Sequence, residues 1–264
     1  MRLRWIVILV LCCLVPLFFG DRPRSDHQEP PVRPVEERPL GDRKVLYIGD
    51  SLSVGPFGQQ LENTLIKDLG REKVWFYASC GSSVQSWLAS EPVFVTPCGY
   101  RESIPKVQLL DDFHDGQKPK GMATPKIEIL LADIHPDLVI VQLGTNHFDA
   151  LELGGTAAVA RHAKIFERFA SSIRQFAPST CAVVWISPPD CARFPEWITS
   201  SIKTLIEKTA AAHQFNVIDS RRYTRYVKGV TGGDGVHYGR DAAFKWANHV
   251  IADLHLVLPA AQHH

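Results

Sequence analysis

Short, almost unbroken apolar runs recur along the chain after residue 44, and segments of helical pattern separate them. A run of this kind predicts a strand that is covered on both faces, as in a parallel sheet. The strand candidates are residues 45–48, 74–78, 138–143, 182–186 and 217–218. Apolar residues recur at helical spacing in residues 57–69, 126–134, 157–176, 198–213 and 241–256. The alternation predicts an α/β fold with a parallel, doubly wound sheet.

One connection in this pattern is longer than the others. Residues 82–124 place aromatic residues among Pro, Gly, Asp and Lys and show no clear periodicity before the helix that starts near residue 126. A long irregular segment inside a compact domain is usually functional or disordered. We interpret it as an insertion, either an ordered flap beside the functional site or a surface loop.

The N-terminal pattern is of a different kind. Arg2 and Arg4 precede an apolar run over residues 5–19, which is the arrangement of an export signal within residues 1–20. The run is shorter than the roughly 20 apolar residues that span a membrane comfortably. The residues just before Gly20 are large, so cleavage of the signal and its retention as a membrane anchor both remain open.

Composition sets the boundaries of the folded part. Residues 21–42 are rich in proline and charge and predict a disordered linker. The chain of 264 residues then has room for one domain, which we place at residues 43–258 with a tail at 259–264.

The formal net charge of +1 creates no field that would recruit nucleic acid, so none is expected as a partner. We expect a monomer.

Four cysteines follow the signal: Cys80, Cys98, Cys181 and Cys191. An even number in an exported chain permits two disulfides, with three possible pairings. We favour the short-range pairs, Cys80 with Cys98 and Cys181 with Cys191. Buried free thiols are the alternative. The spacing contains no C-x-x-C and does not resemble a zinc site, so no metal is expected.

The first predicted strand ends abruptly in Gly49, Asp50 and Ser51. Ligands of open α/β sheets bind at the carboxyl ends of the strands, and the helix that follows would direct its positive N-terminal end to the same place. Ser51 is therefore placed like a nucleophile. Taken alone, such a motif between a strand and a helix is more often a plain turn and helix cap than a nucleophile.

Further polar groups fall on the same predicted edge. Gly81 follows the second strand, Asn146 follows the third, and Asp234 stands three residues before His237 ahead of the last helix. A serine attacks a carbonyl only if a base accepts its proton, and a histidine can do so at neutral pH. Asp234 would orient His237 and stabilise its charged form.

The negative oxygen of the tetrahedral intermediate also needs preorganised donors. The backbone amides of Ser51 and Gly81 and the side chain of Asn146 would form this oxyanion hole. Asp50 and His147 adjoin these positions, and we expect them to contact the substrate.

The ordered blocks that carry this chemistry resemble those of the SGNH hydrolases, also called the GDSL family. They are Gly49-Asp50-Ser51-Leu52-Ser53, Gly81, Gly144-Thr145-Asn146 and Asp234-Gly235-Val236-His237. The resemblance implies a flavodoxin-like, three-layer α/β/α fold with a five-stranded parallel sheet. It also implies ester hydrolysis without a metal or other cofactor, with Ser51 as nucleophile, His237 as base and Asp234 as its orienting acid.

These features predict an exported serine esterase that removes O-acetyl or other small acyl groups from cell-envelope or extracellular carbohydrate. The protein would be periplasmic or secreted, either free or tethered by an uncleaved N-terminal segment. Three alternatives stay open: an O-acyltransferase with the same triad, a lipase or thioesterase, and a noncatalytic carbohydrate-binding module on the same fold.

Overall fold

The computed structural model describes residues 40–112 and 117–258. The predicted export signal, nearly all of the predicted linker and the C-terminal tail lie outside these residues. None of the helices described is both long enough and apolar enough to cross a membrane.

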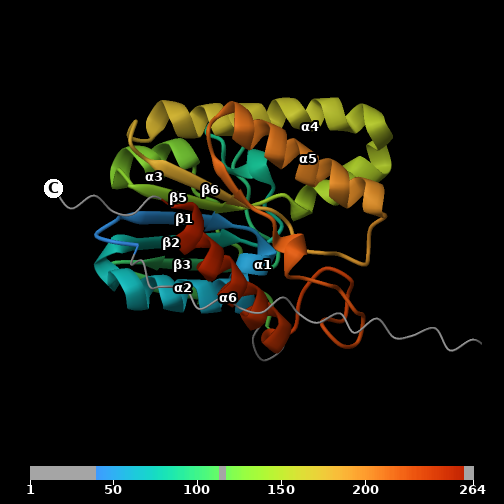
Figure 1. Cartoon of the computed structure of the whole chain (residues 1–264), viewed down its shortest axis with the longest axis horizontal. Coiled ribbons are helices and arrows are strands. Elements are labelled where there is room, and N and C mark those ends of the chain that lie inside the picture. Colours follow the sequence, from blue (N-terminus) through green and yellow to red (C-terminus); the bar gives the residue numbers. More distant parts are fainter. Residues whose placement is uncertain (1–39, 113–116, 259–264) are drawn as a thin grey trace, which may run out of the picture. The chain divides into compact units, whose positions relative to one another are not determined.

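A seven-stranded sheet lies at the centre of the described part of the chain (Figure 1). Its strands are β1 Val45–Gly49, β2 Val74–Ser79, β3 Tyr100–Ile104, β4 Val107–Asp111, β5 Leu138–Gln142, β6 Ala182–Ile186 and β7 Asn216–Ile218. The spatial order is β4-β3-β2-β1-β5-β6-β7. The five predicted strands are all present, and β2, β1, β5, β6 and β7 pair in parallel as expected.

Helices cover both faces of this sheet. They are α1 Ser51–Val54, α2 Pro56–Leu69, α3 Ile127–Ile134, α4 Phe148–Phe176, α5 Glu196–Ala212 and α6 Arg240–Val257. Figure 1 shows α3, α4 and α5 on one side and α2 and α6 on the other. Alternate residues of β1 supply the two cores, since Leu46 and Ile48 face α3 to α5 while Val45 and Tyr47 face α2 and α6. The predicted three-layer α/β/α architecture is confirmed.

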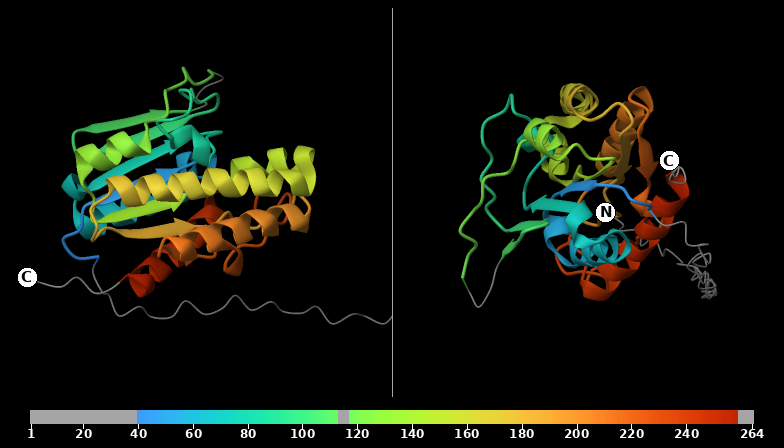
Figure 2. Two further views of the ribbon diagram at one scale, coloured as in Figure 1. Left: turned by 90° about the horizontal axis from the view of Figure 1, so that it is seen from above. Right: turned by 90° about the vertical axis from the view of Figure 1, so that its left-hand side faces the viewer.

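The long connection differs from the prediction of an irregular segment. It contains a 3-10 turn, η2 Val84–Trp87, and the antiparallel hairpin of β3 and β4, which extends the sheet beyond β2 (Figure 2). The sheet therefore has seven strands instead of five. The hairpin was hard to recognise because four of the five residues of β4 are exposed, so no face of that strand carries a buried apolar pattern.

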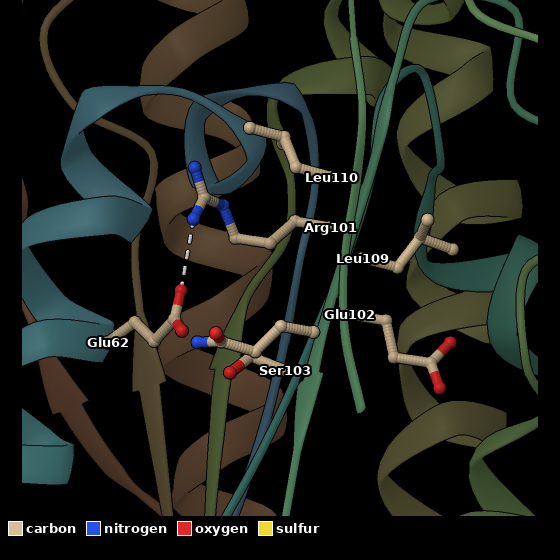
Figure 3. Close-up of a pocket in the computed structure, with 7 residues that line it drawn as sticks. Glu62, Arg101, Glu102, Ser103, Leu109 and Leu110 are labelled. Carbon is tan, nitrogen blue, oxygen red and sulfur yellow. Dashed lines mark hydrogen bonds and ion pairs between the residues drawn. The ribbon is translucent and has the colours of Figure 1, made fainter. Parts of the chain in front are cut away.

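A half-buried arginine holds this hairpin against the helical layer (Figure 3). Arg101 of β3 forms an ion pair with Glu62 of α2, with 3.0 Å between Nη1 and Oε2. Its Nε and Nη2 atoms donate to the carbonyl of Val54, at 3.1 and 3.0 Å. That carbonyl lies at the C-terminal end of α1, where a cation is favourable. The hairpin is thus attached to the helix that begins at Ser51.

A disulfide joins Cys80, after β2, to Cys98, before β3. This was one of the two predicted pairs. The other prediction is wrong, because Cys181 and Cys191 are free thiols. Cys181 precedes β6 and Cys191 lies beyond its carboxyl end, so the length of an extended strand separates them.

The disulfide closes a loop of 18 residues, and a cross-link of this length stabilises a domain mainly by restricting the unfolded chain. We predict that Cys80→Ala/Cys98→Ala lowers the free energy of unfolding by about 2–4 kcal/mol in urea denaturation. Cys191→Ala, which removes a free thiol, is the matched control. Equal losses in the two variants would contradict a stabilising cross-link.

Candidate active site

The position of β1 in the sheet brings three loops together. Gly49, the last residue of β1, pairs with Ala78 of β2 on one side and with Gln142 of β5 on the other. Ser51 follows two residues after Gly49, and the loops that leave β2 and β5 carry Gly81 and Asn146. These predicted site residues therefore emerge at one edge of the sheet.

The turn at the end of β1 is tightly built. A Cβ atom at Gly49 would lie 2.2 Å from Ser53 Oγ, so only glycine fits there. The Asp50 side chain caps α1 by accepting from the Leu52 amide at 3.0 Å. Ser51 is the first residue of α1, and its side chain faces the loop before α6.

A continuous chain of hydrogen bonds joins this serine to the predicted base and acid. His237 Nε2 lies 2.9 Å from Ser51 Oγ, and His237 Nδ1 lies 2.6 Å from Asp234 Oδ2. The other carboxylate oxygen of Asp234 accepts from the backbone amides of Val236 and His237, both at 2.8 Å. The structure thus brings together three residues that lie up to 186 positions apart.

The carboxylate of Asp234 stays ionised in this setting. Burial raises its pKa, but the hydrogen bonds from the His237 ring and from the amides of His237 and Val236 outweigh that effect and lower the pKa to about 2. An ionised Asp234 keeps the imidazole proton on Nδ1, which leaves the lone pair of Nε2 for the hydroxyl of Ser51. This is the arrangement that a general base requires.

Two tyrosines outside the predicted site support the loop of His237. The Tyr226 hydroxyl accepts from the Gly235 amide at 2.9 Å and donates to the His237 carbonyl at 3.3 Å. Tyr238 donates to the carbonyl of Asp190 at 2.7 Å, and the Asp190 side chain in turn accepts from the Tyr226 amide at 2.7 Å. No spacing in the sequence connects these residues, so only the fold reveals them.

The predicted oxyanion donors have free hydrogen atoms at the same edge. The backbone amides of Ser51 and Gly81 donate no hydrogen bond to any part of the chain that the structure describes. Asn146 Nδ2 donates to the carbonyl of Ser82 at 2.9 Å, which holds its side chain in place and leaves its second N–H available. All three predicted donors therefore keep an N–H group that a negatively charged oxygen could use.

The predicted substrate contacts of His147 and Asp50 need correction, because neither side chain reaches the surface. His147 is 2% exposed, accepts from the Val84 amide at 3.2 Å through Nε2, and lies 2.9 Å from His162 through Nδ1. Burial and the neighbouring His162 lower the pKa of His147 to about 3, so its ring is neutral and ties η2 to the loop after β5. Asp50 is 0% exposed.

A small cavity lies beside the serine and histidine. Its volume is about 30 Å³, and its walls include Ser51, His237, Phe57, Tyr238 and Trp246. By this measure a water-sized group needs roughly 10–15 Å³, so the cavity has room for about two such groups. The rings of Phe57 and Trp246 stack at 3.6 Å between centroids and close its apolar side. Among the residues described, no group of three or more His, Cys, Asp and Glu side chains could hold a metal ion.

A known protein family and several solved structures resemble this chain. The profile of the GDSL-like Lipase/Acylhydrolase family matches residues 45–250. No curated protein sequence matches the chain. The crystal structure of TesA superimposes with a TM-score of 0.55 at 17% identity, over 81% of this chain and 99% of that one. Axe2, an acetylxylan esterase from Geobacillus stearothermophilus, superimposes with a TM-score of 0.51 at 10% identity, over 84% and 97%.

At these identities the two structures establish the shared fold, whereas the profile match spans almost the whole of the described domain. The matched residues, 45–250, contain all four sequence blocks that resemble those of the SGNH hydrolases. The chain therefore belongs to the GDSL-like lipase/acylhydrolase family, the SGNH hydrolases.

Proposed function

We propose that this protein is an exported serine esterase that removes O-acetyl or other small acyl groups from cell-envelope or extracellular carbohydrate. The observation that carries the proposal is the hydrogen-bonded chain from Asp234 through His237 to Ser51, beside three free oxyanion donors. Membership of an acylhydrolase family supports ester hydrolysis as the reaction.

In the first half of the reaction, Ser51 Oγ attacks the carbonyl carbon of the ester while His237 Nε2 takes the hydroxyl proton. The carbonyl oxygen becomes negative and is held by the amides of Ser51 and Gly81 and by Asn146. Loss of one such donor typically raises the barrier by about 3 kcal/mol. The C–O bond to the sugar then breaks, His237 returns the proton to the sugar oxygen, and the acyl group remains on Ser51.

In the second half, water takes the place of the sugar. His237 Nε2 accepts a proton from the water as its oxygen attacks the acyl-serine carbonyl, and the same donors hold the new oxyanion. The proton then passes to Ser51 Oγ as the acyl–oxygen bond breaks. Ionised Asp234 stabilises the imidazolium in both halves.

A small acyl group is supported by the size of the cavity beside Ser51, which has room for about two water-sized groups. Carbohydrate as the alcohol part is suggested by the similarity in fold to a structure described as an acetylxylan esterase. Export is supported by the disulfide between Cys80 and Cys98, because such bonds persist in oxidising compartments.

The role of the serine has a direct test. We predict that Ser51→Ala lowers kcat for acetate release from acetylated xylan or acetylated peptidoglycan by at least about 10⁴-fold, because the acyl-enzyme cannot form. Ser53→Ala is unsuitable as a control, since Ser53 lies under the nucleophile. Ser200→Ala is the control and should keep full activity, because the half-buried hydroxyl of Ser200 on α5 bonds Glu196 and Arg221 and no residue of the site. Acetate release at the wild-type rate by Ser51→Ala would refute the mechanism.

The size of the cavity predicts the preference for acyl length. With p-nitrophenyl esters we expect kcat/KM to fall by at least about tenfold from acetyl to hexanoyl, because the added methylene groups do not fit in the cavity of about 30 Å³ beside Ser51. Steady-state kinetics across the series measures this directly. A preference for hexanoyl or longer chains would instead indicate lipase or thioesterase activity.

A further inference from the structure

A seam of polar side chains runs through the core directly under the nucleophile. The Tyr47 hydroxyl lies 2.5 Å from Ser53 Oγ, and Ser53 Oγ donates to Gln142 Oε1 at 2.6 Å. All three side chains are fully buried. Because the carboxamide oxygen of Gln142 is occupied by Ser53, its Nε2 donor is left for a different neighbour.

The adjoining turn carries a buried acceptor that also lacks a partner, the carboxylate of Asp50. Its Oδ1 accepts from the Leu52 amide, whereas Oδ2 has no partner in standard hydrogen-bond geometry within the described chain. The same is true of two buried donors, Gln142 Nε2 and Thr145 Oγ1. The Asp50 amide donates to the carbonyl of Gln142 at 3.2 Å, so the turn of Asp50 lies against the segment that carries both donors. The side chains of Gln142 and Thr145 also lower the pKa of Asp50.

The charge on Asp50 makes these neighbours important. Burial raises the pKa of Asp50 to about 6, against the opposing effects of the Leu52 amide, the nearby His237 and the side chains of Thr145 and Gln142. The group is therefore ionised at neutral pH although it is fully buried. A buried carboxylate holds the donors around it strongly, because leaving it without them is costly.

The donors come from the loop that carries the oxyanion side chain. Asp50 directly precedes Ser51, and Thr145 directly precedes Asn146. Gln142 is the last residue of β5 and pairs with Gly49. A contact of Asp50 with Thr145 and Gln142 thus connects the turn of the nucleophile to the loop of an oxyanion donor. Asp50 lies one residue before Ser51, and Thr145 lies one residue before Asn146.

We propose that Asp50 is a positioning residue for catalysis: its buried carboxylate holds the loop of Asn146 against the turn of Ser51, so that nucleophile and oxyanion donor keep their mutual placement. The proposal rests on the esterase function proposed above. It gives Asp50 a role beyond capping α1, because a cap would require only the bond to Leu52.

The buried charge predicts how stability depends on pH. The ionisable groups that act together with Asp50 are His237 and Tyr47. The folded protein keeps the Asp50 proton up to a pH of about 6, while an unfolded chain releases it near 3.8. The free energy of unfolding of the wild type should therefore fall, relative to Asp50→Asn, as the pH rises from about 4 to 6. Urea denaturation measures this free energy for both proteins. If the difference between the wild type and Asp50→Asn stayed constant from pH 4 to 6, Asp50 would not be a buried anion.

Asp50→Asn also separates positioning from capping. Asparagine caps helices as well as aspartate does and carries no buried charge, so Asp50→Asn should fold, with a melting temperature at pH 7 no lower than that of the wild type. Its amide nitrogen, however, would meet the Nε2 donor of Gln142. We expect kcat/KM to fall by about 10–100-fold, since a small misplacement of reacting groups has an effect of this size. Asp219→Asn, which changes the capping carboxylate of η4 Ser220–Arg222, is the matched control and should stay within about twofold.

A double-mutant cycle with Asn146→Ala provides the decisive test. If Asp50 acts through Asn146, its substitution should matter little once that side chain is absent, and the double variant should lie within about threefold of Asn146→Ala alone in kcat/KM. Losses that multiply in the double variant, or less than about threefold loss in Asp50→Asn, would overturn the proposal. Ser51→Ala is assayed in parallel: if it stays active, the esterase mechanism itself has failed, whereas an inactive Ser51→Ala beside a fully active Asp50→Asn refutes only the positioning role.

Discussion

The parallel pairing of β1 with β2 and β5 is the constraint on which the rest of the structure depends. Because the three strands are in register, the loops that follow them begin at the same edge of the sheet. A serine at the end of the central strand is then flanked by a glycine amide on one side and an asparagine side chain on the other. His237 enters from the far end of the chain, and the loop before α6 needs supports of its own, which Tyr226 and Asp190 supply.

Polar interactions within and beside the core convert this placement into fixed geometry. Asn146 donates to Ser82 and His147 accepts from Val84, so the loop after β5 is bound to the segment that follows Gly81. Asp50 faces the same loop from the turn of β1. Such groups are costly to bury without partners, and that cost makes each contact resistant to displacement.

Much of this site could be predicted from the sequence, because the chemistry depends on residue types at strand ends. Ser51, Asp234, His237, Gly81 and Asn146 follow apolar runs or precede a helix, and the fold places them where that pattern indicates. The hairpin of β3 and β4 could not be predicted, since an exposed edge strand lacks a buried face. The burial of His147 and the free thiol of Cys181 depend on contacts between distant segments, which local pattern does not encode.

The account depends most on a covalent intermediate at Ser51. Its most direct test is peptide mapping by mass spectrometry after the protein is mixed with an activated acetyl ester and quenched in acid. We expect one acetyl group on the peptide that contains Ser51, and none on that peptide in His237→Ala, where no base accepts the hydroxyl proton. Release of acetate by the wild type with acetylation at another residue, or with equal acetylation of Ser51 in His237→Ala, would contradict the mechanism.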